Sequence, residues 1–314
     1  MIFIPLISMK NHNINHEKLN LINNNINIKN SENNYFRILD TSTNQILKIP
    51  EKEFLYSVVA SEMPALFEPE ALKSQAVASY TYFCKKRQEN INKKYDFEIN
   101  TEKSLNYITE QELRKKWGDD YDKYYEKIKN CVDSVYPEVL KYNNNLILSV
   151  YHAISSGTTE KSQDVFGQDL DYLTNINSPG DYLAKNYEVT LEISPQEFKN
   201  KIIKSKKDCK FDDNNIQNWA RDYVKTSGGM IKEITIGSEK FTGKQIREIF
   251  ELRSANFEII YNSETNKFNI ITHGYGHGVG LSQNGAQYFA QNNNYDYKQI
   301  LSTYYPGAEI TRNI

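Results

Sequence analysis

The sequence predicts an α+β protein in which a smaller α+β subdomain is inserted into a mixed larger domain. Strand patterns and helical patterns follow one another along the 314 residues, and no internal repeat of fixed period accompanies them. The stretch 186–257 predicts a small α+β unit, after which strands resume. A hydrophobic fraction of 39% and an aromatic fraction of 12% are enough for a substantial core. We therefore expect a larger domain of residues 35–185 and 258–314, a subdomain of residues 186–257, and a separate N-terminal segment, 1–34.

The first part of the larger domain predicts two strands followed by helices. Residues 36–50 predict a strand, a turn and a second strand. From Glu51 apolar residues recur at spacings of three and four, which indicates a helix that Pro64 ends. A second helix begins at Pro69, since proline suits the first turn and the glutamate after it interacts favourably with the helix dipole. Residues 110–135 predict another helix, of mixed charge.

The rest of the chain predicts shorter strands and helices. In order, these are a hairpin within 140–154 that turns at Asn143–Asn145, a strand followed by a helix that starts at Ser194-Pro195, a strand over 231–237, a helix over 242–252, strands within 257–274, and a helix from Ser282.

The N-terminal segment leaves two interpretations open. Its first nine residues are apolar apart from Ser8, but a bilayer span needs about 20 residues. They lack the basic leader and the small-residue cleavage site of a signal peptide. Residues 10–34 are rich in asparagine, which indicates a flexible tether. The segment is therefore either an ordinary N-terminus or the end of a truncated membrane anchor followed by a tether.

The overall charge gives no case for binding nucleic acid. The chain has 38 basic and 40 acidic residues, a net charge of −2, whereas phosphate binders normally show a basic excess. Its three cysteines, Cys84, Cys131 and Cys209, lie far apart and form no CxxC pair. An odd count leaves at least one thiol free, and a disulfide between the other two stays open.

Three segments hold the residues that could carry chemistry: Ser61–Ala76, Tyr151–Gly167 and Thr272–Gln287. Around His277 glycine occupies alternate positions, which lets the backbone take positive φ and lets other groups approach closely. These glycines match neither the dinucleotide fingerprint nor the phosphate-binding loop, and a plain tight loop is also compatible with them.

Metal and serine chemistry are two alternatives. Outside the first 34 residues the histidines are His152, His273 and His277, a possible zinc set. The HExxH spacing is absent, however, and two of the three lie on one loop. Ser155 or Ser156 could be the nucleophile of a Ser-His-acid hydrolase, although no GxSxG elbow is present.

Glu62 is the candidate general acid. It lies at the end of an apolar helix, near the negative end of the helix dipole and among apolar neighbours. Both effects favour the neutral acid and would raise its pKa, as general acid catalysis near neutral pH requires. The alternative is an ordinary surface glutamate. Glu70 is a poorer candidate, because a helix N-terminus stabilises its charged form.

Together, the three segments resemble the stage II sporulation protein D, or amidase-enhancer, family. EMPALFEPEALKSQAVASYTY, which begins at Glu62, is similar to the family's Glu-Met-Pro and Glu-Ala-Leu-Lys-x-Gln-Ala signature. HAISSGTTEKSQDVFG, from His152, resembles its Ser-Thr/Ser-Gly segment. GYGHGVGLSQNGA, from Gly274, and YYPGAEI, from Tyr304, resemble its closing motif. The motifs occur in the expected order from about residue 36 to the end of the chain.

The resemblance implies a peptidoglycan lytic transglycosylase that needs no cofactor and whose catalytic glutamate is Glu62. Such enzymes cleave between N-acetylmuramic acid and N-acetylglucosamine during engulfment of the forespore, preferably on strands without stem peptides, and leave 1,6-anhydro ends. The larger domain would be the catalytic domain. The residues implied to line its groove and bind the sugars are Gln75, His152, Ser155, Ser156, His277, Ser282 and Gln283. The alternative is a non-catalytic, glycan-binding enhancer of a cell-wall amidase.

The resemblance also implies partners and a location. The expected partners are peptidoglycan glycan strands, a cell-wall amidase or endopeptidase (stage II sporulation protein P) and a membrane protein (stage II sporulation protein M). The expected location is outside the cytoplasm, anchored to the membrane or the sporulation septum by the N-terminal segment.

One departure from the family concerns zinc. Some relatives hold zinc through a Cys-x4-His-Cys segment near the catalytic groove. The corresponding stretch here, Asn100–Ile108, has no cysteine and no histidine. We therefore expect no metal by that route.

Overall fold

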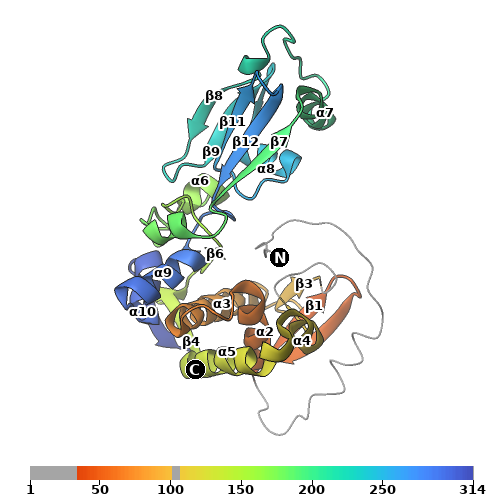
Figure 1. The fold of residues 1–314 in the computed structure, drawn as a ribbon. Helices are drawn as coiled ribbons and strands as arrows, with labels where there is room; N and C mark the ends of the chain where they lie inside the picture. Colours follow the sequence, from red (N-terminus) through yellow and green to blue (C-terminus); the bar gives the residue numbers. More distant parts are fainter. Residues whose placement is uncertain (1–33, 101–106, 314) are drawn as a thin grey trace. The chain divides into compact units, whose positions relative to one another are not determined.

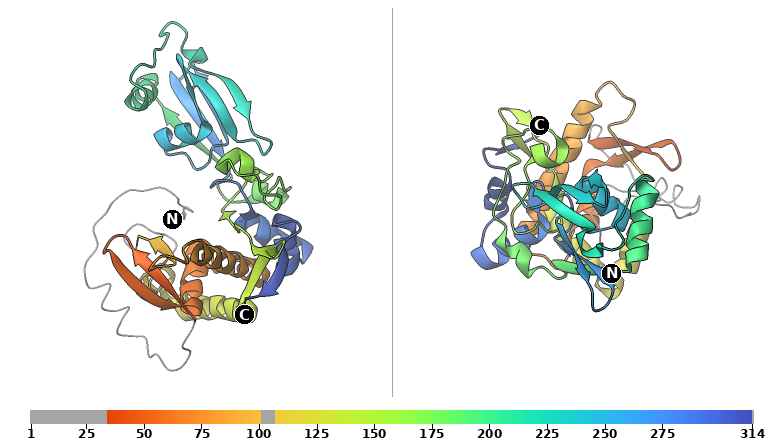
Figure 2. Two further views of the ribbon diagram at one scale, coloured as in Figure 1. Left: turned by 180° about the vertical axis from the view of Figure 1, so that it is seen from behind. Right: turned by 90° about the horizontal axis from the view of Figure 1, so that it is seen from above.

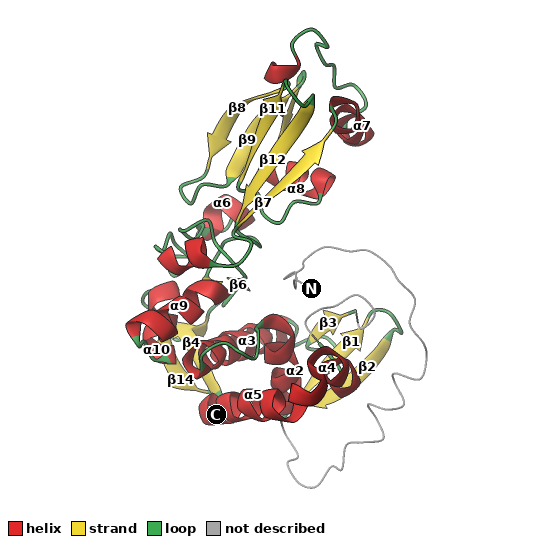
Figure 3. Cartoon of the chain, viewed as in Figure 1, coloured by secondary structure: helices red, strands yellow, loops and turns green. Residues whose placement is uncertain are grey.

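The computed structural model describes residues 34–100 and 107–313, which form two compact units (Figure 1). Within the described residues, unit 1 comprises residues 34–100, 107–149 and 309–313, and unit 2 comprises residues 150–308. The mixture of helices and small sheets in both units confirms the expected α+β class (Figure 3). The expected tether and anchor, except Asn34, and most of the stretch Asn100–Ile108 lie outside the described residues.

Unit 1 combines three-stranded sheets with long helices. Its strands are β1 (Tyr35–Asp40), β2 (Gln45–Pro50), β3 (Phe97–Ile99), β4 (Glu138–Tyr142), β5 (Asn145–Leu146) and β14 (Glu309–Arg312). Its helices are α2 (Glu51–Glu62), α3 (Pro69–Glu89), α4 (Glu110–Trp117), the 3-10 helix η1 (Gly118–Asp120) and α5 (Tyr121–Val135). In one sheet β1 lies between β2, which is antiparallel to it, and β3, which is parallel. In the other, β4 lies between β14 and β5, both antiparallel.

Phenylalanines from four elements form part of the core of unit 1. Phe36 of β1, Phe54 of α2, Phe83 of α3 and Phe97 of β3 are all buried. The ring centroids of Phe83 and Phe97 lie 4.6 Å apart, and those of Phe54 and Phe83 lie 4.8 Å apart. Burying rings of this size dominates the stability of a small core, so these contacts hold α2 and α3 against the sheet.

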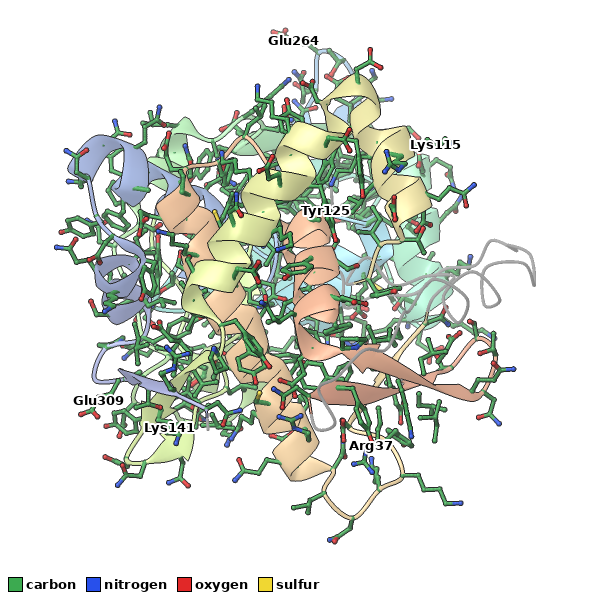
Figure 4. The ribbon with its side chains drawn as sticks, turned by 90° about the horizontal axis from the view of Figure 1, so that it is seen from below. Arg37, Lys115, Tyr125, Lys141, Glu264 and Glu309 are labelled. Atoms are coloured by element: carbon green, nitrogen blue, oxygen red, sulfur yellow. The ribbon has the colours of Figure 1, made fainter. Side chains whose placement is uncertain are left out.

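Helix α5 covers α2 and α3 on the side away from these rings. Figure 4 shows Tyr125 of α5 near α2, where its ring centroid lies 6.2 Å from that of Tyr56. In the second sheet, Glu309 of β14 lies opposite Lys141 of β4, and both are labelled in Figure 4.

Two local predictions for unit 1 need correction. The helix expected over residues 110–135 is two helices, because Gly118 takes a positive φ of 54° between α4 and α5, which ends the α-helical path. The hairpin expected within 140–154 has its turn at Asn143 and Asn144, both of positive φ, as a tight turn requires. Its second strand, however, ends at Leu146.

Unit 2 consists of short strands and helices. Its strands are β6 (Tyr151–His152), β7 (Glu188–Ile193), β8 (Ala220–Lys225), β9 (Ile231–Ile236), β10 (Glu239–Phe241), β11 (Phe257–Asn262), β12 (Lys267–His273) and β13 (Leu281–Ser282). Its helices are α6 (Ser162–Phe166), α7 (Pro195–Ser205), α8 (Gly243–Phe250), α9 (Gln283–Asn293) and α10 (Tyr297–Tyr304), with 3-10 turns η2 (Pro179–Leu183) and η3 (Ile216–Asn218). The sheets β11-β12-β7 and β10-β9-β8 are antiparallel, and β13 pairs with β6 in parallel.

An aromatic cluster forms part of the core of unit 2. Figure 2 shows the strands and helices of this unit from two further directions. Phe198 of α7 stacks on Phe268 of β12 at 4.5 Å and on Phe250 of α8 at 5.0 Å. Trp219, the residue before β8, also stacks on Phe268, with ring centroids 5.7 Å apart. The expected helix starts at Ser194 and Ser282 are confirmed, since each side chain accepts a hydrogen bond as an N-cap.

The units differ from the domain ranges drawn from the sequence. Residues 258–273, which we expected to belong to the larger domain, form nearly all of β11 and β12, and β12 pairs with β7 over six residues. The sheet β11-β12-β7 therefore extends beyond residue 257, and its buried side chains share one core with those of residues 186–257. The division into folding domains of 35–185 with 258–314, and 186–257, stays a prediction.

Two further expectations concern the membrane and the thiols. Among residues 34–100 and 107–313, no helix has the length and apolar character needed to cross a bilayer. Cys84, Cys131 and Cys209 are each buried and free, so none of them forms the disulfide that the sequence left open.

Candidate functional site

Glu62 is the last residue of α2, and its side chain is partly exposed. The helix ends there because Met63 is extended, with φ −116° and ψ 145°, as a residue before proline prefers. Met63 is 1% exposed, and its amide still donates to the carbonyl of Val59 at 3.0 Å. The buried methionine thus anchors the helix end, while the carboxylate beside it reaches solvent.

Lys116, which the sequence analysis did not single out, lies beside this helix end. Its Nζ donates to the carbonyl oxygen of Ala60 at 2.9 Å, and its charge interacts with that of Glu62. Burial lowers the pKa of Lys116 to about 8, and the Glu62 carboxylate opposes that shift. A half-buried lysine one residue before Trp117 carries no sequence signal, because its partner is 54 positions away in the chain.

Gln75, the other predicted site residue of unit 1, is fully buried in α3. Its Nε2 donates to Oγ of Ser79, one turn later, at 2.9 Å. A side chain with no exposed surface contacts no ligand in this conformation. The structure therefore supports a packing role for Gln75 rather than direct contact with a sugar.

The other six predicted site residues belong to unit 2, where β6 and β13 bring the second and third segments together. Parallel pairing aligns Tyr151 with Leu281 and His152 with Ser282. Further along, the Ile154 amide donates to the Tyr275 carbonyl, and the Tyr275 amide donates back. The glycines make this approach possible: a Cβ on Gly280 would lie 2.1 Å from the carbonyl oxygen of Val150.

Asp181 of η2 joins two of the predicted serines, although no motif pointed to it. Oγ and the amide of Ser155 both donate to Oδ2 of Asp181, at 2.5 and 2.9 Å, and Oγ of Ser282 donates to Oδ1 at 2.7 Å. All three side chains are buried. Burial raises the pKa of Asp181 to about 6, although its hydrogen bonds oppose the shift. The two hydroxyls are thus committed to this carboxyl.

The two histidines of this site are in contact, with ring centroids 5.7 Å apart. Nδ1 of the fully buried His152 lies 3.1 Å from the Val279 carbonyl, so it must carry the proton, whereas Nδ1 of His277 accepts from the Val279 amide at 3.1 Å. Burial lowers the pKa of His152 to about 3 and that of His277 to about 4. Both rings are therefore neutral near pH 7.

Glu160 is a second acid that the sequence analysis passed over. It is 1% exposed, and Oε1 accepts from Thr226 Oγ1 and from the Met230 amide, both at 2.9 Å. Its own amide donates to the Gly278 carbonyl at 2.7 Å. Glu160 thus connects the loop that carries His277 to the turn between β8 and β9. Burial raises the pKa of Glu160.

The remaining predicted residues differ in exposure. Ser156 is partly exposed, and its hydroxyl donates to the Gly228 carbonyl at 2.9 Å. His277 is also partly exposed, whereas Gln283 at the start of α9 is 3% exposed. Of the unit 2 residues expected to bind sugar, Ser156 and His277 are thus accessible in this structure, and His152, Ser155, Ser282 and Gln283 are buried.

The alternatives based on metal and serine receive no support in the described residues. Residues 34–100 and 107–313 contain no group of three or more His, Cys, Asp or Glu side chains that could hold a metal ion. His273 bonds instead to Glu188, with Nε2 3.0 Å from Oε2. Neither Ser155 nor Ser156 donates to a histidine in the part of the chain that the structure describes. The expectation that no zinc binds by the route through Asn100–Ile108 stays a prediction.

Known proteins resemble this chain over most of its length. The family described as "Stage II sporulation protein" matches residues 39–142. Stage II sporulation protein D of Bacillus amyloliquefaciens is 33% identical over 279 residues, which cover 86% of this chain and 77% of that protein. The protein of the same name from Bacillus subtilis (strain 168) is 32% identical over 274 residues, with the same coverage. The amidase enhancer of Bacillus subtilis (strain 168) is 26% identical over 305 residues, which cover 82% of this chain and 40% of that protein.

Proposed function

The chain belongs to the stage II sporulation protein D family, and from this premise we propose that it is a lytic transglycosylase that cleaves peptidoglycan glycan strands with Glu62 as its acid and base. The bond cleaved joins N-acetylmuramic acid to N-acetylglucosamine, preferably on strands without stem peptides. The biological setting is sporulation, as the names of the relatives indicate.

One observation carries the proposal: Glu62 is a partly exposed carboxyl at the end of a buried helix, next to a lysine ammonium. The neutral histidines and committed serines of unit 2 are poorly suited to proton transfer. A single acid is enough for this chemistry, unlike hydrolysis by paired carboxylates, because the attacking hydroxyl belongs to the substrate.

In the proposed reaction Glu62 acts twice. It first donates its proton to the glycosidic oxygen, and the bond from that oxygen to C1 of the muramic acid breaks. The C6 hydroxyl oxygen of the same sugar then bonds to C1, and its proton passes to the Glu62 carboxylate. The products are a free hydroxyl on the leaving strand and a 1,6-anhydro ring, with Glu62 protonated as at the start and no water consumed.

Glycan contacts in unit 2 are proposed for Ser156 and His277, because these two predicted residues are accessible. His277 accepts a hydrogen bond from the Val279 amide through Nδ1 and also bonds to the backbone of Tyr151, so its ring is held in place and would contact a sugar through its exposed surface. In unit 2, the buried His152, Ser155, Ser282 and Gln283 would support the contacts of Ser156 and His277, whereas Gln75 would have a packing role within unit 1.

Partners and location are part of the same proposal. A glycan-cleaving protein of this family would act outside the cytoplasm, on the membrane or septum, with residues 1–34 as its anchor and tether. A cell-wall amidase or endopeptidase, stage II sporulation protein P, would supply strands without stem peptides, and stage II sporulation protein M would be its membrane partner.

The test compares the full chain with Glu62→Gln on glycan strands that lack stem peptides, with mass spectrometry of the new ends. We expect anhydro-muramic ends, lighter than reducing ends by one water, from the wild type. The Gln variant should form them roughly 10²- to 10⁴-fold more slowly, the usual contribution of a general acid or base. Glu70→Gln is the matched control: Glu70 lies in the same motif and pairs with Lys73, and its variant should retain activity.

The same experiment decides the second candidate function, a glycan-binding enhancer of an amidase, which the name of the Bacillus subtilis relative favours. Glycan binding without new ends from the wild type would favour the enhancer. Reducing ends would indicate a hydrolase instead.

A further inference from the structure

We propose that Lys116 is a positioning residue for Glu62: it holds the end of α2 in place and supplies the positive charge that stabilises the carboxylate formed when Glu62 gives up its proton. The inference rests on the proposed function, in which Glu62 acts first as an acid and then as a base.

The geometry begins with α4, which carries Lys116 one residue before its end. Thr109 and Glu112 form a capping box at the start of this helix. Four residues after Glu112, the Lys116 side chain crosses to the last turn of α2, where Nζ bonds to Ala60. The amide of Met63, the residue after the end of α2, already donates to the carbonyl of Val59. The Ala60 carbonyl is thus among the last carbonyls of the helix, which lack partners within it, and the lysine satisfies it.

The position also places a full positive charge at the negative end of the helix dipole. Ala60 is two residues before Glu62, so an ammonium held at the Ala60 carbonyl lies close to the Glu62 backbone and side chain. The charges of Lys116 and Glu62 interact there. Lys116 is half-buried, and its Nζ lies 5.6 Å from the centroid of the Trp117 ring, so its freedom to move away is limited.

The other charged residues of α2 lie in its first turn, whereas on α4 Arg114 and Lys115 lie close to Lys116 in sequence, and Lys115 is exposed. Glu62 follows Glu51 by 11 positions, roughly 16 Å along the axis. At the N-terminal end of α2, Glu51 bonds to Arg87 and Tyr80 of α3 and to Tyr136. Lys52 pairs with Asp133 of α5, and Glu53 faces Tyr107 and Tyr125. On α4, Glu110 pairs with Arg114, and Glu112 bonds to Thr109.

This arrangement changes the prediction made from the sequence for Glu62. The helix end and the apolar neighbours favour the neutral acid, whereas the Lys116 ammonium favours the carboxylate. Opposing influences suit a group that must both release and take up a proton in one reaction. Below a pH of about 8 the lysine is largely charged, so its influence covers the range in which a carboxyl titrates.

The test follows the titration of Glu62 directly, by carbon-13 NMR of the full chain with labelled glutamate carboxyls. Glu62→Gln identifies the resonance. Lys116→Gln keeps a donor for Ala60 but removes the charge, and Lys116→Arg keeps the charge. Lys115→Gln is the control, since Lys115 is exposed on the same helix (Figure 4). We expect the Glu62 midpoint to rise by about one pH unit in Lys116→Gln, the lower end of the effect of a nearby opposite charge, and to stay unchanged in the other two.

A reciprocal measurement needs no change at Lys116. Glu62→Gln should lower the titration midpoint of Lys116, followed through its labelled side chain, by the same amount, because the coupling between two charges is mutual. An unchanged Glu62 midpoint in a folded Lys116→Gln, or an unchanged Lys116 midpoint in Glu62→Gln, would overturn the proposal.

Strand cleavage separates this inference from the proposed function. The pH at which cleavage declines should rise with the Glu62 midpoint in Lys116→Gln, whereas a purely structural role would lower the rate at every pH without moving the profile. Absence of anhydro ends from the wild type would refute the proposed function, yet the two NMR titrations would still decide the role of Lys116 beside Glu62.

Discussion

Asp181 illustrates how much of the unit 2 site depends on single buried groups. It accepts hydrogen bonds from Ser155 and Ser282, which come from two different sequence motifs. Buried hydroxyls need such partners, because an unsatisfied polar group in the interior is costly. Asp181 also bonds to Ser178, the residue before η2, whose Oγ lies 2.6 Å from Oη of Tyr304 in α10. Most of the predicted sugar-binding residues of unit 2 are thus parts of its framework.

The raised pKa of Asp181 predicts a specific pH dependence of stability. A group with a raised folded-state pKa contributes stability that is fully present below its ordinary value, 3.8, and is lost as the pH rises through about 6. Roughly two pKa units correspond to about 3 kcal/mol. Asp181→Asn, which has no proton to lose, should therefore lack this fall. Urea unfolding of unit 2 near pH 4 and pH 7, followed by fluorescence of Trp219 in a Trp117→Phe background, measures it.

The control for this prediction is Asp169→Asn, since Asp169 is exposed in the same unit. It should keep the pH dependence of the wild type. If Asp181→Asn also keeps it, the Asp181 carboxyl does not titrate as its burial implies.

At the scale of elements, a capping box built on threonine begins one helix in each unit. In α4 the box is Thr109 with Glu112, and in α8 it is Thr242 with Gln245. In both boxes, the threonine Oγ1 accepts a hydrogen bond from the amide three residues later. Of these two helices, α4 carries Lys116, which bonds to Ala60 and whose charge interacts with that of Glu62.

This pair of helices predicts different effects from the same substitution. Thr109→Ala and Thr242→Ala should each destabilise their own unit by about 1 kcal/mol, the usual value of an N-cap. Thr109→Ala should also reduce strand cleavage, because it loosens the helix that holds Lys116 in place. Thermal unfolding together with a cleavage assay of both variants checks this. Equal losses of cleavage would contradict a specific role for α4.

At the scale of the whole molecule, unit 1 is completed by the end of the chain. Residues 309–312 form β14, which pairs with β4, and the amide of Asn313 donates to the Pro137 carbonyl at 2.8 Å. Unit 2 is continuous, from Val150 to Ala308, and lies between the two parts of unit 1 in the sequence.

Removal of the residues after Ala308 should therefore destabilise unit 1 and leave unit 2 intact. The lost pairing with β4 should cost about 3 kcal/mol or more, at about 1 kcal/mol for each backbone hydrogen bond. Trp117 reports on unit 1 and Trp219 on unit 2, so urea unfolding of single-tryptophan variants separates the two effects. Glu309→Ala is the control, because it keeps the backbone of β14. Equal destabilisation of both units would contradict the division.

The sequence by itself determined the local features and the family. Apolar spacing placed α2 and α3, proline and serine marked the helix starts at Pro69, Ser194 and Ser282, and three motifs identified the family to which the chain belongs. These features depend on residues that are neighbours along the chain or on short motifs that can be recognised in the sequence itself. Local chemistry is enough to predict them. The break between α4 and α5 also falls at Gly118, and glycine is a residue type that commonly ends helices.

Only the tertiary structure decided which distant groups meet. It paired β12 with β7, placed Asp181 beneath Ser155 and Ser282, and brought Lys116 to the helix end that carries Glu62. It also showed that Gln75 and most of the predicted sugar-binding residues of unit 2 are buried. Burial and long-range charge pairs depend on how elements pack, and the packing of residues 54 or 101 positions apart leaves no pattern in the sequence of either partner.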